Sequence, residues 1–417
     1  MLEHVFREGR IGPLALPHRI VMGSMHLGLE GLDDGGRALA AFYRERALGG
    51  AGLIVTGGSA VSRVGAGGRN YSFVNDEAAA DALGGVADAV HEGGGRVLLQ
   101  LFHAGRYAYQ DSFGLQPVAP SAVYSGYSRC EPRALSHGEI LETVADFARG
   151  AARARELGYD GVEIMGSEGY LLSQFMAPLT NLRDDQWGGD VERRMRFPLE
   201  LAAAVREAAG SALAVVYRIS GADLVDGGAS QEEVLGLAVA LADDGLVDAL
   251  NVGIGWHEAR VPTVQLLVPP GAWRPWARAI RDVAGVPVIA SNRINTLAMA
   301  DELLVAGDAD FVSLARPFLA DAEIVAKGRA ADRRAVNVCI ACDQACIDRS
   351  IFDRRVSCVV NPRAGHELEF PWAEGAAATV GEGAAIAVVG GGPAGMEAAR
   401  ALAADGFRAH LFEAGPR

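Results

Sequence analysis

The sequence predicts a (β/α)8 barrel of the TIM type, followed by a cysteine-rich segment and the start of a Rossmann-like domain. A short apolar run followed by an amphipathic stretch recurs eight times over about 330 residues, a length that suits such a barrel. The runs are rich in Val, Ile and Leu and barely alternate with polar residues, as expected of parallel strands covered on both faces. Polar side chains gather just after the runs, where a barrel carries its chemistry.

The predicted strands are the eight apolar runs, at 19–25, 52–58, 96–102, 160–166, 213–220, 248–254, 286–292 and 309–315. The helices between them carry start signals, since Ser136 and Glu139 form a capping-box pattern that Ser230 and Glu233 repeat. Pro198 lies inside the helix predicted for 190–208 and is expected to kink it. An open, doubly wound sheet is the alternative, but eight evenly repeated units favour closure.

Composition narrows the classes of function. The chain has 417 residues with 38 basic and 52 acidic side chains, a formal net charge of −14. Such an acidic chain repels a phosphate backbone, which argues against nucleic-acid binding as its main task. The N-terminus lacks a signal-peptide pattern, and no apolar stretch reaches the ~18 residues of a membrane span. We therefore expect a cytoplasmic protein that acts on small molecules, without a nucleic-acid or membrane partner.

Two groups of residues at the predicted strand ends are candidates for chemistry. Tyr170 and His257 follow the fourth and sixth strands, where a protonated phenol can act as a general acid and an imidazole can support it. Arg293 and Arg316 follow the last two strands, where barrels often bind a phosphate. Ordinary packing for the first pair, and surface salt bridges for the second, are the alternatives.

Four cysteines crowd into the predicted segment 331–365, with the spacing Cys339-x2-Cys342-x3-Cys346-x11-Cys358. Three closely spaced thiolates and a fourth from a short loop suit a [4Fe–4S] cluster, whereas zinc sites more often pair two C-x2-C knuckles. Structural zinc and coincidental buried thiols remain as alternatives. Cys130 stands apart and is expected to be a bystander.

We predict that the remainder of the chain forms a linker, 366–383, and a dinucleotide-binding fragment, 384–417. Within the fragment, Gly390, Gly392 and Gly395 form a G-x-G-x-x-G motif between a predicted strand and helix, and Glu413 ends a second strand. These residues predict the start of an FAD- or NAD(P)-binding domain. One βαβ arm cannot enclose a dinucleotide, so we expect no tight binding by this fragment alone.

Together these motifs resemble a known family. GSMHLGLE (23–30), LQLFHAGR (99–106), MGSEGYL (165–171), PLTNLRDDQWGG (178–189) and ARPFLAD (315–321) resemble the old yellow enzyme family. More specifically, GIGWHEARVPT (253–263) and CIACDQAC (339–346) look like the bacterial 2,4-dienoyl-CoA reductases, which group with trimethylamine dehydrogenase and the clostridial enoate reductases. The similarity runs over residues 1–417, and it ends where members of that family continue with their FAD and NADP domain.

The resemblance implies FMN in the barrel, a [4Fe–4S] cluster beside it, and FAD and NADPH in the remainder of the FAD/NAD(P) domain. It implies hydride transfer from FMN to a 2,4-dienoyl-CoA or a related enoate, with Tyr170 as proton donor and His257 assisting. The residues that match the family's FMN contacts are Ser24, Met25, Gly58, Gln100, Arg218, Arg293, Ala315 and Arg316.

Two features depart from the pattern of those reductases. An Arg often stands where this chain has Leu179, and the loop 107–134 is longer than usual, so we expect it to overhang the pocket. The alternatives for function are an enoate, enone or amine oxidoreductase on the same scaffold, and an electron carrier or inert fragment that lacks its NADPH-facing half.

Overall fold

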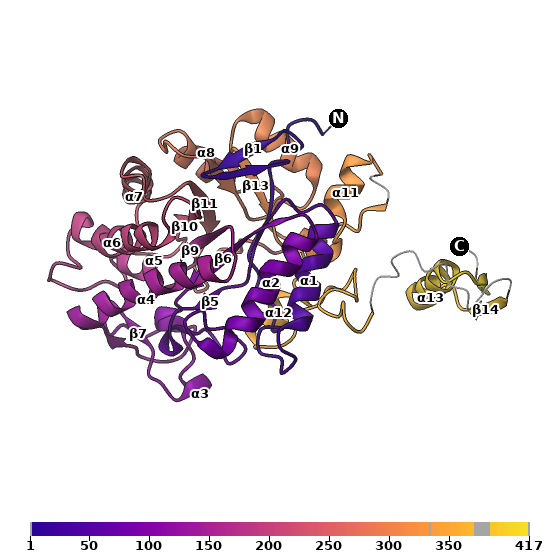
Figure 1. Cartoon of the computed structure of the whole chain (residues 1–417), viewed down its shortest axis with the longest axis horizontal. Coiled ribbons are helices and arrows are strands. Elements are labelled where there is room, and N and C mark those ends of the chain that lie inside the picture. Colours follow the sequence, from indigo (N-terminus) through magenta and orange to yellow (C-terminus); the bar gives the residue numbers. More distant parts are fainter. Residues whose placement is uncertain (1, 333–334, 371–383, 416–417) are drawn as a thin grey trace. The chain divides into compact units, whose positions relative to one another are not determined.

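The computed structural model describes residues 2–332, 335–370 and 384–415, so most of the expected linker lies outside the described residues. The chain divides into two compact units, Met1–Leu368 and Glu369–Arg417, shown in Figure 1. The first unit holds the barrel and the cysteine-rich segment, and the second holds the Rossmann-like fragment.

Eight parallel strands close into a barrel. They are β3 (Ile20–Met22), β4 (Leu53–Val55), β6 (Arg96–Phe102), β9 (Gly161–Gly166), β10 (Ala214–Ala222), β11 (Ala249–Ile254), β12 (Val288–Ala290) and β13 (Phe311–Leu314). Neighbours along the chain pair with one another, and β13 pairs with β3, as Val312 does with Ile20. All eight predicted strands are therefore confirmed, and closure excludes the open sheet.

Helices surround these strands (Figure 1). They are α1 (Arg37–Leu48), α2 (Ala80–Glu92), α4 (His137–Glu156), α5 (Leu171–Met176), α6 (Val191–Ala209), α7 (Gln231–Asp243), α8 (Arg274–Arg281), α9 (Leu297–Ala306), α10 (Arg316–Ala320) and α11 (Ile324–Arg329). Both predicted capping boxes are present, at Ser136 with Glu139 and at Ser230 with Glu233. Pro198 lies inside α6, as the sequence indicates.

The barrel unit also contains short strands and short helices outside the barrel repeat. They are β1 (Gly9–Ile11), β2 (Leu14–Leu16), β5 (Ser59–Ala60), η1 (Arg63–Gly65), η2 (Glu77–Ala79), η3 (Gly105–Tyr107), α3 (Gln110–Phe113), β7 (Val118–Ala119), β8 (Arg133–Ala134) and α12 (Ile347–Ile351). The last of these, α12, lies within the cysteine-rich segment.

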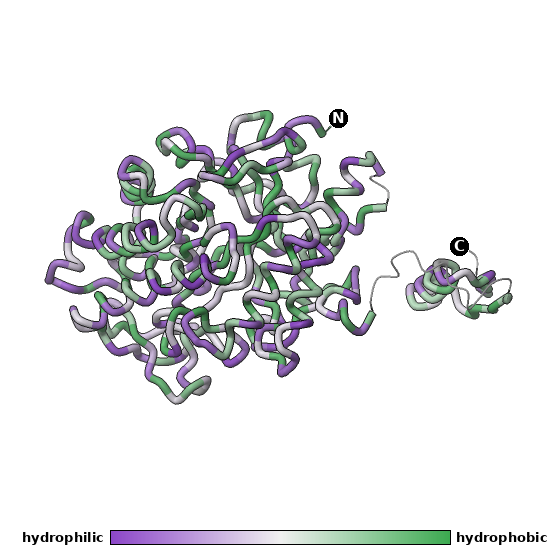
Figure 2. The backbone as a smooth tube through the Cα atoms, in the orientation of Figure 1, coloured by the Kyte–Doolittle hydropathy of each residue, from purple (hydrophilic) through white to green (hydrophobic). Residues whose placement is uncertain are grey.

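Apolar side chains fill the amino-terminal end of the barrel. Ile11 and Leu16 of the β1–β2 hairpin pack there in one cluster with strand residues such as Val216 and Ile289. In Figure 2, where the backbone is coloured by hydropathy, green hydrophobic segments run through the middle of the larger unit. Because this end is closed by packed hydrocarbon, the polar side chains of the interior lie toward the carboxyl ends of the strands.

Two ion pairs attach α1 to the end of the cysteine-rich segment and to the first residues of the predicted linker. Arg46 Nη1 lies 2.5 Å from Glu367 Oε1, with both side chains buried, and Arg363 Nη2 lies 2.9 Å from Glu45 Oε2. The Arg46 guanidinium also lies 3.6 Å from the ring centroid of Phe42. The segment is thus part of the barrel unit.

Replacing Glu367 with Ala should lower the free energy of unfolding of the barrel unit by about 3–5 kcal/mol, because it leaves the buried Arg46 charge uncompensated. Urea unfolding followed by tryptophan fluorescence measures the change. Glu3→Ala is the control, since it removes an exposed pair with Arg7 and should leave the midpoint near that of the wild type. Equal stability of the two variants would contradict a structural role for the buried pair.

The second unit is a βαβ arm. It comprises β14 (Ala385–Val389), α13 (Pro393–Ala404) and β15 (Arg408–Phe412), and the two strands are parallel. Gly390 has a φ of 108°, which favours glycine, and a Cβ on Gly395 would collide with the Gly390 carbonyl oxygen. The predicted strand–turn–helix–strand is confirmed. The carboxylate of Glu413, which follows β15, accepts a hydrogen bond from the Gly391 amide of this turn (2.6 Å).

No helix in the described part of the chain is long and apolar enough to span a membrane.

Candidate active site

Tyr170 and His257 meet at the carboxyl end of the barrel. Tyr170 follows β9 and precedes α5, and His257 follows β11. The Tyr170 hydroxyl and His257 Nε2 lie 2.7 Å apart, a hydrogen bond between residues 87 positions apart in the chain. The structure therefore brings together the two residues that the sequence suggests for acid chemistry.

The surroundings of this pair fix its protonation. Burial raises the pKa of Tyr170 well above its usual value of 10.0, and the nearby Tyr71 and Glu168 raise it further. Desolvation by the surrounding side chains lowers the pKa of His257 from 6.5, although the residue as a whole is exposed. At neutral pH the phenol is protonated and the imidazole is neutral, so one group donates the shared hydrogen bond and the other accepts it.

Aromatic rings and one carboxylate build the wall beside this pair. The Tyr127 ring stacks on His257 with centroids 5.2 Å apart, and Tyr107 lies 5.6 Å from the same imidazole. Glu258 accepts hydrogen bonds from the Tyr107 hydroxyl (3.0 Å) and the Gly126 amide (2.9 Å) and pairs with Arg106. The loop 107–134 is thus tied over the strand ends.

A chain of hydrogen-bonded polar side chains crosses the interior of the barrel. Ser24 Oγ donates to Gln100 Oε1 (3.0 Å), and Gln100 Nε2 donates to Glu163 Oε1 (2.8 Å). Asn251 Nδ2 donates to the other oxygen of Glu163 (2.7 Å). A Cβ on Gly58 would lie 3.1 Å from Gln100 Oε1, so this glycine leaves room above the amide. Three residues predicted to contact a ligand therefore lie together, at the ends of three different strands.

Arg218, on β10, forms a two-point ion pair with Glu168. Its Nη2 and Nε lie 2.5 and 3.2 Å from the two carboxylate oxygens. Glu168 has a φ of 52° and is the second residue after β9, two residues before Tyr170. Neither Glu168 nor Glu163 was predicted to have a role. The signals were present, since one is an acid after a strand end and the other interrupts an apolar run.

The two strand-end arginines differ in their partners. Arg293 is 6% exposed and donates to the Val268 carbonyl and to Asn295 Oδ1, both at 2.7 Å. It has no ion pair among residues whose placement is described. Burial and the neighbouring Arg316 lower the pKa of Arg293, as expected of a cation beside another cation. A buried guanidinium with neutral partners suits an anionic ligand. This environment of Arg293 differs from the surface salt bridge of the alternative prediction.

Arg316 instead pairs with Asp343 and donates to the Val264 carbonyl (2.7 Å). Ala315, just before it, is the N-cap of α10, and Met25 lies partly buried after β3. These residues lie around the same carboxyl ends as Arg293.

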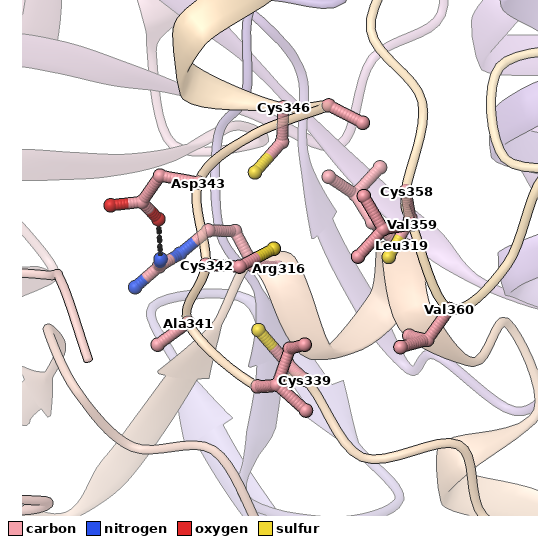
Figure 3. A pocket seen from close by; sticks show the side chains of 12 residues that line it. Arg316, Leu319, Cys339, Ala341, Cys342, Asp343, Cys346, Cys358, Val359 and Val360 are labelled. Atoms are coloured by element: carbon pink, nitrogen blue, oxygen red, sulfur yellow. Dashed lines mark hydrogen bonds and ion pairs between the residues drawn. The ribbon is translucent and has the colours of Figure 1, made fainter.

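The four cysteines of the motif line one pocket (Figure 3). Their loop turns through Ala341 and Asp343, which both have positive φ values, 55° and 63°. No three or more His, Cys, Asp or Glu side chains in the described ranges lie close enough for a single metal ion. The sulfur atoms are spaced around the pocket instead, with Arg316 and Asp343 beside them.

Comparisons with known proteins agree with the fold. Residues 4–334 match the model of the NADH:flavin oxidoreductase / NADH oxidase family, and residues 388–417 match an NAD(P)-binding Rossmann-like domain. A metal reductase of Desulforamulus reducens is 41% identical over 409 residues, which cover 98% of this chain and 60% of that protein.

Two solved structures are also similar. A 2-naphthoyl-CoA reductase bound to 2-naphthoyl-CoA has a TM-score of 0.92 and 27% identity, and the match covers 99% of this chain and 64% of that one. Histamine dehydrogenase from Rhizobium sp. 4-9 has a TM-score of 0.90 and 26% identity, with coverage of 100% and 60%. The chain thus spans about three fifths of the length of these proteins.

Proposed function

The chain belongs to the NADH:flavin oxidoreductase / NADH oxidase family, and from this premise we propose that its barrel is an FMN-dependent reductase. The substrate we propose is an α,β-unsaturated acyl-CoA thioester, with a 2,4-dienoyl-CoA as the leading member. The observation that carries the proposal is the Tyr170–His257 hydrogen bond of 2.7 Å at the carboxyl ends of the strands. The similarity to a structure that holds an aromatic acyl-CoA supports the thioester class.

In this proposal the chain supplies the proton of the reduction. FMN, when bound, supplies the hydride. Tyr170 donates its phenolic proton to the α-carbon of the thioester, where negative charge develops as hydride arrives further along the conjugated system. His257 Nε2 lies within hydrogen-bond distance of the phenol oxygen and replaces that proton from solvent. One hydride and one proton complete the two-electron reduction of the double bond.

The residues of the barrel fit FMN. Arg293 is a buried cation with only neutral partners in the described structure, which suits a phosphate. Gln100, held by Ser24 and Glu163, presents amide groups that suit the polar edge of a flavin ring. Met25, Gly58, Arg218, Ala315 and Arg316 complete the proposed set.

We propose a [4Fe–4S] cluster for the cysteine pocket. Cys339, Cys342, Cys346 and Cys358 line one pocket, and their spacing in the sequence suits a cubane better than the paired C-x2-C knuckles of zinc sites. Such a cluster supplies one-electron transfer. FAD and NADPH, bound by a complete Rossmann-like domain that Gly390, Gly392, Gly395 and Glu413 begin, would be the source of electrons.

Oxidation of an amine is the second candidate, and a specific observation favours it. The rings of Tyr107, Tyr127 and Tyr170 lie within about 6 Å of one another or of His257. Aromatic faces attract cations, and a protonated amine is a cation. One of the similar structures is a histamine dehydrogenase.

A competition experiment separates the two candidates. The anaerobic chain, reduced by a continuous supply of dithionite, is offered equal concentrations of 2,4-decadienoyl-CoA, cinnamate and 2-cyclohexenone, with products measured by mass spectrometry. In parallel, the oxidised chain is mixed with dimethylglycine and histamine. We expect consumption of the thioester first and no bleaching of the flavin by amines. Flavin bleaching by an amine, without reduction of any alkene, would replace the first candidate with the second.

The pH dependence should reflect the Tyr170–His257 pair. Because the pKa of Tyr170 lies above 10.0 and that of His257 below 6.5, both groups keep one protonation state between these values. The rate constant for reoxidation of the reduced flavin by the thioester is therefore expected to be constant from about pH 7 to 9. Stopped-flow absorbance measures it, and a transition within that range would contradict these protonation states.

A further inference from the structure

One ion pair that lines the cysteine pocket includes Arg316, one of the two strand-end arginines. Arg316 begins α10 directly after the last barrel strand, and Asp343 follows Cys342 in the cysteine loop. Their side chains are 12% and 10% exposed, and Arg316 Nη1 pairs with Asp343 Oδ1 (Figure 3). A pair with this little solvent access is weakly screened, so its charges act strongly on their neighbours.

The pair is the charged part of the pocket. Of the residues that line it, Arg316 is the one cation and Asp343 the one carboxylate, and the others are cysteines and aliphatic residues. Arg316 also reaches away from the cysteines, since it donates to the Val264 carbonyl (2.7 Å) and lowers the pKa of Arg293. The Arg316 guanidinium therefore lies between the cysteine pocket and Arg293, the residue proposed to bind the phosphate.

A second connection joins the same two places. Asn295 Nδ2 donates to the Cys339 carbonyl (3.1 Å), while its Oδ1 accepts from Arg293 Nη1 (2.7 Å). Both strand-end arginines thus reach the cysteine loop, Arg316 through Asp343 and Arg293 through Asn295. Asp343 adopts a φ of 63° to place its carboxylate there.

We propose that Asp343 is a positioning residue that holds the Arg316 charge between the two cofactor sites and thereby sets the reduction potential of the iron–sulfur cluster. The proposal rests on the cluster and the FMN of the proposed function. Four thiolates make the cluster site negative, and reduction adds one more negative charge. A positive neighbour favours the reduced form of the cluster, and a carboxylate favours the oxidised form. In the intact pair, the effects of the two charges on the reduction potential therefore nearly cancel.

Four variants of the full chain test this balance by EPR-monitored potentiometric titration after anaerobic reconstitution. Asp343→Asn should shift the cluster potential to more positive values, because Arg316 is then uncompensated. Arg316→Gln should shift it to more negative values and weaken FMN binding, measured by flavin fluorescence. The double variant should return close to the wild-type potential, because it removes one charge of each sign. Asp343→Glu, which retains the carboxylate, should also stay close to the wild type.

Asp348→Asn is the matched control, because it makes the same charge change in the same segment at an exposed side chain, where solvent screens the effect. Its shift should be much smaller than that of Asp343→Asn. An unchanged or more negative potential in Asp343→Asn, with iron content equal to the wild type, would overturn the role of Asp343 alone. A wild-type chain that takes up no iron and sulfide would instead overturn the proposed cluster, and the role of Asp343 with it.

Discussion

Replacing Tyr170 with Phe is expected to slow reoxidation of the reduced flavin by an unsaturated thioester about 10²–10⁴-fold, the usual contribution of a positioned general acid. The change removes one hydroxyl and keeps the ring, which packs edge to face against Phe102 at a centroid distance of 4.5 Å. FMN affinity should stay at the wild-type value, because Tyr170 is not among the residues proposed to bind the flavin. Anaerobic stopped-flow absorbance measures the rate.

Tyr124→Phe provides the control, since Tyr124 belongs to the overhanging loop and its side chain is 58% exposed. It should reoxidise at the wild-type rate. His257→Gln should slow the reaction less than Tyr170→Phe, because the phenol that touches the substrate remains. If Tyr170→Phe reacts as fast as the wild type, the acid is another group, and Glu168, two residues away in the same strand-end turn, becomes the first to test.

Replacing Cys342 with Ser should abolish the iron–sulfur cluster, because a cubane needs all four ligands and a serine hydroxyl is a poor substitute for a thiolate. Iron and acid-labile sulfide, measured on anaerobic preparations, should fall from near four of each per wild-type chain to a small remainder. FMN binding should persist at reduced affinity, since the loop that bears Asp343 also positions Arg316.

Cys130→Ser is the matched control for this substitution. Cys130 lies in the overhanging loop, where its thiol contacts Gln110 Oε1 and the Glu131 carbonyl, apart from the four-cysteine pocket. Its iron content should equal that of the wild type. Iron that survives in Cys342→Ser, or zinc in place of iron in the wild type, would contradict the proposed cluster.

The barrel could be predicted from the sequence because its signals are local. Each strand is a run of Val, Ile and Leu that is buried on both faces, and each helix start, such as Ser136 with Glu139, uses residues a few positions apart. Closure was predicted from the eight evenly repeated units, but the strand pair that closes the barrel, β13 with β3, joins segments about 290 residues apart and is visible only in the structure.

The candidate site was predictable in part for the same reason. The carboxyl ends of the strands gather polar residues in any such barrel, so Tyr170, His257 and Arg293 were found without knowing their partners. Glu168, Glu163 and Asp343 acquire their roles only from residues distant in the chain, Arg218, Gln100 and Arg316. No spacing rule links these pairs, because the contacts are made by the closed barrel and the folded cysteine loop.

The most direct test of the proposed function is a single turnover. The purified chain is reduced anaerobically with dithionite, freed of excess reductant and mixed with 2,4-decadienoyl-CoA, while flavin and dienoyl absorbance are followed together. Rapid reappearance of oxidised flavin with matching loss of the dienoyl chromophore is the expected result. A reduced flavin that persists in the presence of the thioester, yet reoxidises with 2-cyclohexenone or cinnamate, would contradict the proposal that the barrel is a thioester reductase.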